Sequence, residues 1–263
     1  MRPLLTCCAA LIAIAQPGLT QAQTFAAMVS PPRVELQADP GKTVRGVFEL
    51  TNRADGPSEY LFRTADWSLS PDFNVTFQDA LQPESCRPWV ALERASAVVP
   101  ATGTIHYRVE VAVPPTATPG ECRFAILIEG KESSVAKAGA VSMPMTGRIG
   151  LIVYVTIGNA APLLEIFGPT LATVNGHQLP TIRLHNAGNA HGRVSGFLSG
   201  TDAKGIKYDF NPSDFPILPQ QVADVYLTPS TSTDDHPELT YPVHVTGALQ
   251  WGSQSLEIDE QFR

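Results

Sequence analysis

The 263-residue sequence has little charge, few cysteines and, after its first residues, no long apolar run. Charged residues make up 16% of the chain and the formal net charge is −7, with no cluster of Lys or Arg that offers a surface for phosphates. We therefore expect no nucleic-acid partner. Beyond the N-terminus no segment reaches the roughly 18 apolar residues of a membrane-spanning helix, so we expect no stable membrane insertion.

The motifs of several enzyme classes are also missing. The chain has no Gly-x-Ser-x-Gly elbow, no His-Glu-x-x-His pair and no phosphate-binding loop. His185 and His191 flank a predicted turn, but no Cys, Asp or Glu stands beside them, and a structural zinc site needs four well-spaced ligands. We expect no enzymatic activity, no metal and no cofactor.

Residues 1–22 have the pattern of a secretory signal peptide. Arg2 supplies a positive charge, the apolar stretch Leu4–Ala15 is too short to span a bilayer, and small residues suit cleavage after Ala22. Cys7 and Cys8 lie inside the apolar stretch rather than after it, which makes a lipoprotein anchor the weaker alternative. We expect the mature chain to be exported.

Removal of the signal peptide would leave two of the four cysteines, Cys86 and Cys122. Two cysteines in an exported chain most often pair. We predict a disulfide bond between them, with two buried free thiols as the alternative.

The rest of the chain reads as short strands, and no window has helical periodicity. Apolar residues alternate with polar ones or form strand-length runs, and turns rich in Gly, Pro and Asp separate these segments. Their spacing is typical of a β-sandwich rather than of βαβ units. A second series follows Pro162, and "TIGNAAP", residues 156–162, is the natural boundary. We predict an all-β chain with one domain at 23–158 and another at 159–263.

The stretch "AVSMPMTGRIGLIVYV", Ala140 to Val155, changes character along its length. Val141, Met143 and Met145 alternate with polar residues or proline, and after Arg148 comes a nearly unbroken apolar run. An ordinary edge strand that leads into a core strand has this pattern. A strand whose first half serves a partner, and whose second half serves the core, has it too.

Four segments of the first half, in their order, resemble the periplasmic chaperones of chaperone–usher pilus assembly. They are "SPPRVELQADPGKTVRGVFELTN", "WVALERASAVVPATGTIHYRVEVAVP", "PGECRFAILIEG" and "GRIGLIVYV". The second half matches this family in length and strand count only. The resemblance implies two immunoglobulin-like β-sandwich domains in tandem, and a periplasmic chaperone that binds incomplete pilus or fimbrial subunits by donor-strand complementation and delivers them to an outer-membrane usher.

The resemblance also implies which residues bind the subunit. Val141, Met143 and Met145 would fill the groove of the incomplete subunit, and methionine suits a surface that accepts several partners. Arg33, at the start of the first strand, would hold the carboxylate of the subunit's C-terminus through its planar guanidinium. A solvated strand arginine is the alternative for Arg33.

The chain departs from the family where the family has a lysine on its last strand. Gly150 falls on that position, and Arg148 lies two residues earlier, on the same face of the strand. Arg148 either serves in place of the lysine or is a surface charge.

An apolar edge that is exposed without a subunit is an aggregation liability. We therefore expect the free chain to cap it, either by dimerising or by folding back the polar loop at residues 130–140, which we expect to be mobile until a subunit binds. A second function class is an exported two-domain binding or structural module that recognises a surface component by its loops. In such a module Arg33 and the strand edge would be buried or scattered.

Overall fold

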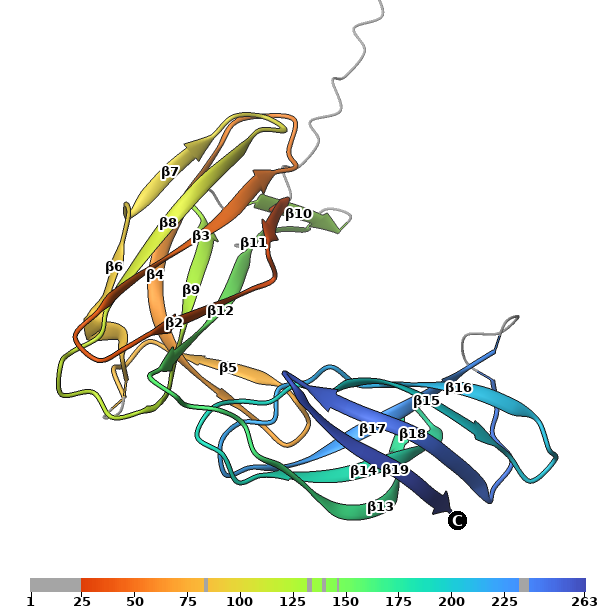
Figure 1. Cartoon of the computed structure of the whole chain (residues 1–263). Coiled ribbons are helices and arrows are strands. Elements are labelled where there is room, and N and C mark those ends of the chain that lie inside the picture. Colours follow the sequence, from red (N-terminus) through yellow and green to blue (C-terminus); the bar gives the residue numbers. More distant parts are fainter. Residues whose placement is uncertain (1–24, 83–84, 132–133, 139–140, 146, 232–236) are drawn as a thin grey trace, which may run out of the picture.

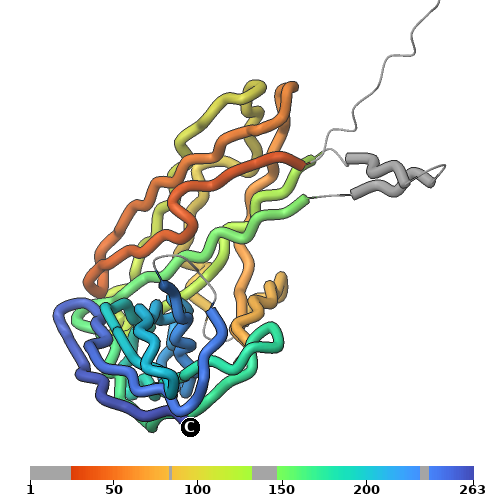
Figure 2. The backbone as a smooth tube through the Cα atoms, turned by 90° about the vertical axis from the view of Figure 1, so that its right-hand side faces the viewer, coloured from red at the N-terminus to blue at the C-terminus, as the bar shows by residue number. Residues whose placement is uncertain are grey.

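The computed structural model describes residues 25–263 except 83–84, 132–133, 139–140, 146 and 232–236 (Figure 1). The predicted signal peptide, residues 1–22, lies outside the described residues. Strands dominate the part of the chain that is described, and one short 3₁₀ helix, η1 (Arg87–Trp89), is also present there. The strands form two sandwich-like units joined at an angle, so the molecule is bent (Figure 1 and Figure 2). The predicted all-β fold is confirmed.

The first unit, which we call the N-terminal sandwich, has two sheets and a hairpin. One sheet has the order β1 (Ala27–Ser30), β3 (Thr43–Asn52), β8 (Thr104–Ala112) and β6 (Val90–Leu92). The other has the order β2 (Arg33–Ala38), β12 (Arg148–Ile157), β9 (Gly120–Gly130), β4 (Ser58–Leu69) and β5 (Val75–Gln78), and β7 (Ser96–Val99) pairs with β4. The chain crosses between the sheets at Pro31 and Pro32, so β1 pairs with β3 and β2 with β12.

The core of the N-terminal sandwich lies between these two sheets. Alternating burial along β3 and β8 places Phe48, Leu50, Tyr107 and Val109 in the core, which is the period-two pattern that the sequence predicts. Cys86 and Cys122 belong to this core, and they form a disulfide bond with their Cα atoms 6.0 Å apart. The predicted pairing of the two cysteines is confirmed.

Strand β12 is apolar along most of its length because both of its faces are covered. Leu151, Val153 and Val155 enter the core between the sheets. Ile152 and Tyr154 face the other way, where Ile152 packs against a small cluster of Ala65, Ala125 and Leu127, and the ring of Tyr154 contacts Trp67. Strands buried on both faces read as continuous apolar runs. This accounts for the second half of the stretch Ala140–Val155.

The first half of that stretch forms a hairpin. Strand β11 (Val141–Met145) pairs antiparallel with β10 (Ser134–Ala138) in a two-stranded sheet of its own. Residues 130–140 were expected to be a polar loop, and this expectation is wrong where β10 lies. Pairing explains the difference, since Ser134–Ala138 supplies backbone partners to β11 along all five of its residues.

The second unit, which we call the C-terminal sandwich, is one long sheet folded on itself. Its order is β13 (Leu164–Val174), β14 (His177–Asn186), β17 (Val222–Ser230), β16 (Lys207–Pro212), β15 (Ser195–Thr201), β18 (Val243–Trp251) and β19 (Gln254–Phe262). Strand β17 makes the fold possible, because its first half pairs with β14 and its second half with β16. The core between the two layers shares no residue with that of the N-terminal sandwich. The predicted domain limits, 23–158 and 159–263, stay a prediction.

Candidate functional site

The edge of β12 is open over its first four residues. Strand β9 pairs with β12 along its whole length, from Arg148 to Ile157. Strand β2 pairs with the other edge only from Ile152 onward, starting at Arg33. Within the described residues, Arg148–Leu151 therefore has one neighbouring strand, and the opposite edge offers its backbone groups to another chain. Arg33 lies where this open edge ends.

Arg33 and Arg148 lie on the same outward face of the sheet but apart from one another. Arg33 pairs in register with Ile152, four residues beyond Arg148. At about 3.3 Å per residue this separation is roughly 13 Å along the strand. Arg148 is placed instead beside Glu129, with 2.6 Å between its Nε and Oε1 of Glu129. The two arginines thus do not converge on one point.

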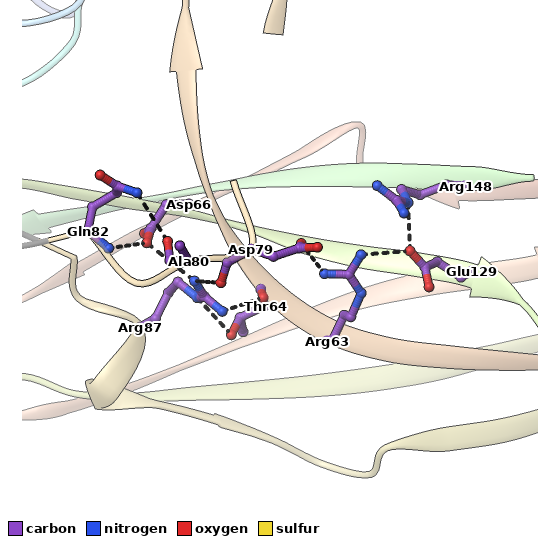
Figure 3. Close-up of polar contacts among 9 residues, drawn as sticks. All are labelled: Arg63, Thr64, Asp66, Asp79, Ala80, Gln82, Arg87, Glu129 and Arg148. Atoms are coloured by element: carbon purple, nitrogen blue, oxygen red, sulfur yellow. Dashed lines mark hydrogen bonds and ion pairs between the residues drawn. The ribbon is translucent and has the colours of Figure 1, made fainter. Parts of the chain in front are cut away.

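Arg148 belongs to a network on the outward face that Figure 3 shows. Nη2 of Arg63 donates to the same Glu129 oxygen at 2.9 Å, and Nη1 of Arg63 donates to Asp79. Arg87, further along, donates to the Thr64 carbonyl at 2.7 Å. These bonds tie the segment after β5 to β4 and β9. The guanidinium of Arg148 is therefore paired with Glu129, within the N-terminal sandwich.

The segment around β5 also explains why glycine stands at position 150. Phe77, on β5, lies over Gly150, and a Cβ atom added to Gly150 would come within 2.1 Å of the Phe77 ring. A lysine there would displace that ring. The β4–β5 hairpin thus covers the outward face of the sheet at position 150, and a side chain there would require the Phe77 ring to move.

Arg33 is held by acidic groups from both sandwiches. Its Nε donates to Oε1 of Glu35 at 2.7 Å. Its Nη1 lies 3.8 Å from Oδ2 of Asp214, in the loop between β16 and β17. The hydrogen bond to Glu35 raises the pKa of the Arg33 guanidinium, and burial opposes this. Burial would raise the pKa of the Glu35 carboxyl, but the bond from Arg33 and other basic groups nearby bring it below its usual value.

A second arginine reaches the same carboxylate from the C-terminal sandwich. Nη1 of Arg193 lies 3.6 Å from Oδ1 of Asp214 and donates to the Asp214 main-chain carbonyl. Its Nη2 donates to the Tyr154 hydroxyl at 3.5 Å. Its Nε is buried and, among the described residues, has no hydrogen-bond partner. Sequence patterns did not single out Arg193 or Asp214, because both lie in turns whose periodicity carries no signal.

His191 completes the junction, by which we mean the contacts of the loops at 187–194 and 213–217 with the N-terminal sandwich. Its ring stacks on Tyr154, with ring centroids 3.8 Å apart. Its backbone N–H donates to Oε2 of Glu121 at 2.8 Å, and its Nδ1 also contacts that oxygen. The side chain of Glu121 is completely buried. His191, which the sequence offered only as a weak metal ligand, serves here as a contact between the sandwiches.

One aromatic contact links the β4–β5 turn to the loop that carries Asp214. The rings of Phe73 and Phe215 stack with centroids 4.2 Å apart and an interplanar angle of 12°. Phe73 has a φ of 58°, in the left-handed region that side chains rarely adopt. The turn is thus shaped so that Phe73 meets the residue next to Asp214.

The other predicted binding residues lie in β11. The structure defines the backbone of Val141, Met143 and Met145, which pairs with Ala138, Ala136 and Ser134. It also shows that β11 and the open part of β12 follow one another along the chain. Their role in binding stays a prediction.

In the described part of the chain, no group of three or more His, Cys, Asp or Glu side chains is placed to hold a metal ion. No helix formed by the described residues is both long and apolar enough to cross a membrane.

Comparisons with known proteins find matches only among solved structures. No family model matches the chain, and no curated protein matches it. The class 5 fimbriae chaperone CfaA is 12% identical, with 89% of this chain and 98% of that chain covered and a TM-score of 0.49. The SafB chaperone of Salmonella enterica, solved with the SafA pilin, is 10% identical, with coverage of 91% and 99% and a TM-score of 0.48.

A third example is the CupB2 chaperone of Pseudomonas aeruginosa, which is 9% identical, with 90% of this chain and 100% of that chain covered and a TM-score of 0.47. The resemblance to pilus chaperones that the sequence indicates is therefore found again among solved structures. At these identities and TM-scores, any functional assignment depends on the geometry of the site itself.

Proposed function

We propose that this protein is a periplasmic chaperone that binds incomplete pilus or fimbrial subunits by donor-strand complementation and passes them to an outer-membrane usher. In this mode a strand of the chaperone adds to the sheet of its client, so that backbone hydrogen bonds give affinity and alternate side chains give specificity. No nucleotide and no catalytic group is needed, because the exchange of strands supplies the free energy.

The observation that carries the proposal is the open edge of β12 beside Arg33. Arg148–Leu151 pairs with β9 alone among the described residues, whereas Ile152–Ile157 is enclosed by β9 and β2. The same strand therefore has a half built into the core and a half able to accept another strand. The preceding strand, β11, carries the alternating Val141, Met143 and Met145, which in our proposal enter the client's groove.

Arg33 supplies a second point of attachment. It stands at the end of the open edge, where a client strand that adds to Arg148–Leu151 would stop. A guanidinium binds a terminal carboxylate through two parallel hydrogen bonds. A two-domain binding module that works through its loops would give no reason for Arg33 to lie at the end of an open strand edge, so the geometry favours the chaperone.

The edge and the arginine can be tested separately. The chain is co-expressed with candidate pilus subunits, captured by an affinity tag, and each variant is also melted. Met143→Glu would bring an unpaired charge into an apolar groove and should abolish capture while the free protein keeps its melting temperature. Val98→Glu is the matched control, because Val98 is 63% exposed on β7, away from the open edge.

Arg33→Ala should weaken capture by about 1.5–3 kcal/mol, the value of a charge-assisted contact. Arg45→Ala is its control, since Arg45 is an exposed strand arginine that pairs with Glu110 at 2.7 Å on the opposite sheet. Val153→Glu, in the core, should unfold the N-terminal sandwich. If Met143→Glu lowered the melting temperature as much as Val153→Glu does, β11 would be ordinary core and the proposal would fail.

A further inference from the structure

The two arginines at the junction already hold a carboxylate. Nη1 of Arg33 lies 3.8 Å from one oxygen of Asp214, and Nη1 of Arg193 lies 3.6 Å from the other. One arginine comes from the N-terminal sandwich and the other from the C-terminal sandwich. Asp214 thus sits between two guanidinium groups, which is the arrangement that a terminal carboxylate of a client would take up.

Accepting the proposed chaperone function as the basis, we infer that Asp214 occupies the carboxylate site in the free protein, and that Arg193 is the second cation of this site. A client's terminal carboxylate would then replace the Asp214 carboxylate between Arg33 and Arg193. Gly150 cannot supply the missing cation, and Arg148 is paired with Glu129 about four strand residues away from Arg33. Arg193 fills that place from the other sandwich.

The exchange costs little free energy because one carboxylate, that of the client, takes the place of another, that of Asp214. Both guanidinium groups keep a carboxylate partner before and after, so neither arginine is left as an unpaired, partly buried charge. The Asp214 side chain is 63% exposed, whereas that of Arg193 is 19% exposed. Exposed ion pairs are weak, so Asp214 can leave at little cost. The buried Nε of Arg193 offers a further donor that no described group uses.

A second contact holds Asp214 in place. Phe215, the next residue, stacks on Phe73 of the β4–β5 turn. The main-chain carbonyl of Asp214 also accepts a hydrogen bond from Arg193. These contacts fix the loop while leaving the carboxylate as the part that competes with a client. Loosening either the carboxylate or the aromatic stack should therefore favour client binding.

The test uses two synthetic peptides of eight residues with alternating threonine and valine, one ending in a free carboxylate and the other in an amide. Their dissociation constants are measured for the full chain. Asp214→Asn should tighten binding of the carboxylate peptide by about three- to tenfold, the scale of weak ion pairs, and leave the amide peptide unchanged. Asp224→Asn is the matched control, because Asp224 pairs with Arg183 at 2.7 Å in the same sandwich.

Two further variants identify the partners of the carboxylate. In the Asp214→Asn protein, Arg193→Gln should reduce the preference for the carboxylate peptide over the amide peptide to the part that Arg33 supplies, while Arg193→Lys, which keeps the charge, should retain more of it. Phe73→Gly should act in the same direction as Asp214→Asn, since glycine accepts the positive φ of this position and the stack with Phe215 is lost. Melting curves of each variant confirm that it is folded.

The outcomes separate this inference from the function on which it rests. If Asp214→Asn changes neither peptide, changes both equally, or fails to bind the carboxylate peptide, Asp214 does not occupy the site and the inference is wrong. If Arg33→Gln lowers the affinity for the carboxylate peptide in that case, the Arg33 site itself still stands. If the Asp214→Asn protein binds the two peptides alike, both with and without Arg33→Gln, the carboxylate site of the proposed function fails.

Discussion

Asn52 ends β3 and Asn186 ends β14, and both side chains are completely buried. Each asparagine Oδ1 accepts a hydrogen bond from the backbone N–H two residues later, at 3.0 Å for Asn52 and 2.9 Å for Asn186. Each Nδ2 donates to the carbonyl four residues later, at 2.8 Å in both cases. The turns that follow β3 and β14, which we call the asparagine corners, are thus held by the same hydrogen bonds from the same kind of side chain.

The two corners differ in the contacts of the loops that follow them. The loop after Asn52 is held within its own sandwich, where Nδ2 of Asn52 also donates to the carbonyls of Val99 and Pro100. The loop after Asn186 carries Asn189, His191 and Arg193, all of which contact the N-terminal sandwich. A buried asparagine fixes the shape of a loop, and the side chains that follow decide whether that loop becomes a junction.

The disulfide bond of the N-terminal sandwich predicts the largest effect on stability. The Cys86–Cys122 bond closes a span of 36 residues in the N-terminal sandwich, and loss of such a link costs about 4 kcal/mol in the chain-entropy model. Replacing both cysteines by alanine should lower the N-terminal unfolding transition in calorimetry and leave the C-terminal transition in place. Equal shifts of both transitions would show that the sandwiches unfold as one unit.

The asparagine corners predict the second-largest effect on stability. Asn52→Ala and Asn186→Ala each leave buried carbonyl and N–H groups without partners, at a cost of about 3 kcal/mol to the sandwich concerned. Asn211→Ala is a control, because the Asn211 amide makes a surface bond to Ser230. Urea unfolding should show similar losses for the two corners. A loss at one corner only would mean that their shared geometry is not a shared source of stability.

The junction predicts a smaller effect on stability, which concerns only the loop after Asn186, since that loop contacts the other sandwich. Glu121→Gln removes the charge of a buried carboxylate that holds His191 and should weaken the coupling of the two sandwiches by about 1–2 kcal/mol. Small-angle scattering should then show a wider spread of bend angles. Glu165→Gln is the matched control, since Glu165 pairs with His185 at 3.6 Å outside the junction. An unchanged scattering profile for Glu121→Gln would contradict the junction described here.

Lowering the pH should produce the smallest difference in stability between the two sandwiches. Burial would raise the pKa of Asp202, but backbone N–H groups of Ile206 and Lys204 and the Tyr208 hydroxyl lower it below its usual value. A carboxyl with a lowered folded-state pKa adds stability above the unfolded pKa, about 3.9, and loses it as the pH falls through the folded value. The C-terminal transition of the wild-type chain should therefore weaken below about pH 4, and Asp202→Asn should flatten this dependence. Asp259→Asn is the control, because Asp259 is 80% exposed.

The sequence predicts the strands well and the contacts between them unevenly. Alternation in "RGVFELTNRA" predicts β3, and the two cysteines predict their bond, because both depend on local pattern or on a count. Strand β10 was missed, because "SVAKA" has little apolar character and is a strand only through its pairing with β11. Local propensity gives no sign of such a partner.

The junction could not be predicted for a different reason. Arg193, Asp214 and Glu121 are far apart in the sequence, and each lies in a turn or at a strand end where side chains follow no period. Their meeting depends on how two separate cores are oriented. The resemblance implied a lysine at position 150, where this chain has glycine, but the Phe77 ring that lies over Gly150 belongs to β5, in another hairpin.

The pairing of β12 has a consequence for accuracy of assembly. Ten consecutive residues, Arg148–Ile157, are matched one to one with β9, and six of them are also matched with β2. A slip by one residue would turn Leu151, Val153 and Val155 out of the core, so this alignment is strongly fixed. In the proposed function, a client strand that adds to Arg148–Leu151 would meet a template that cannot shift, and the core of the N-terminal sandwich would then set the alignment in which the client is held.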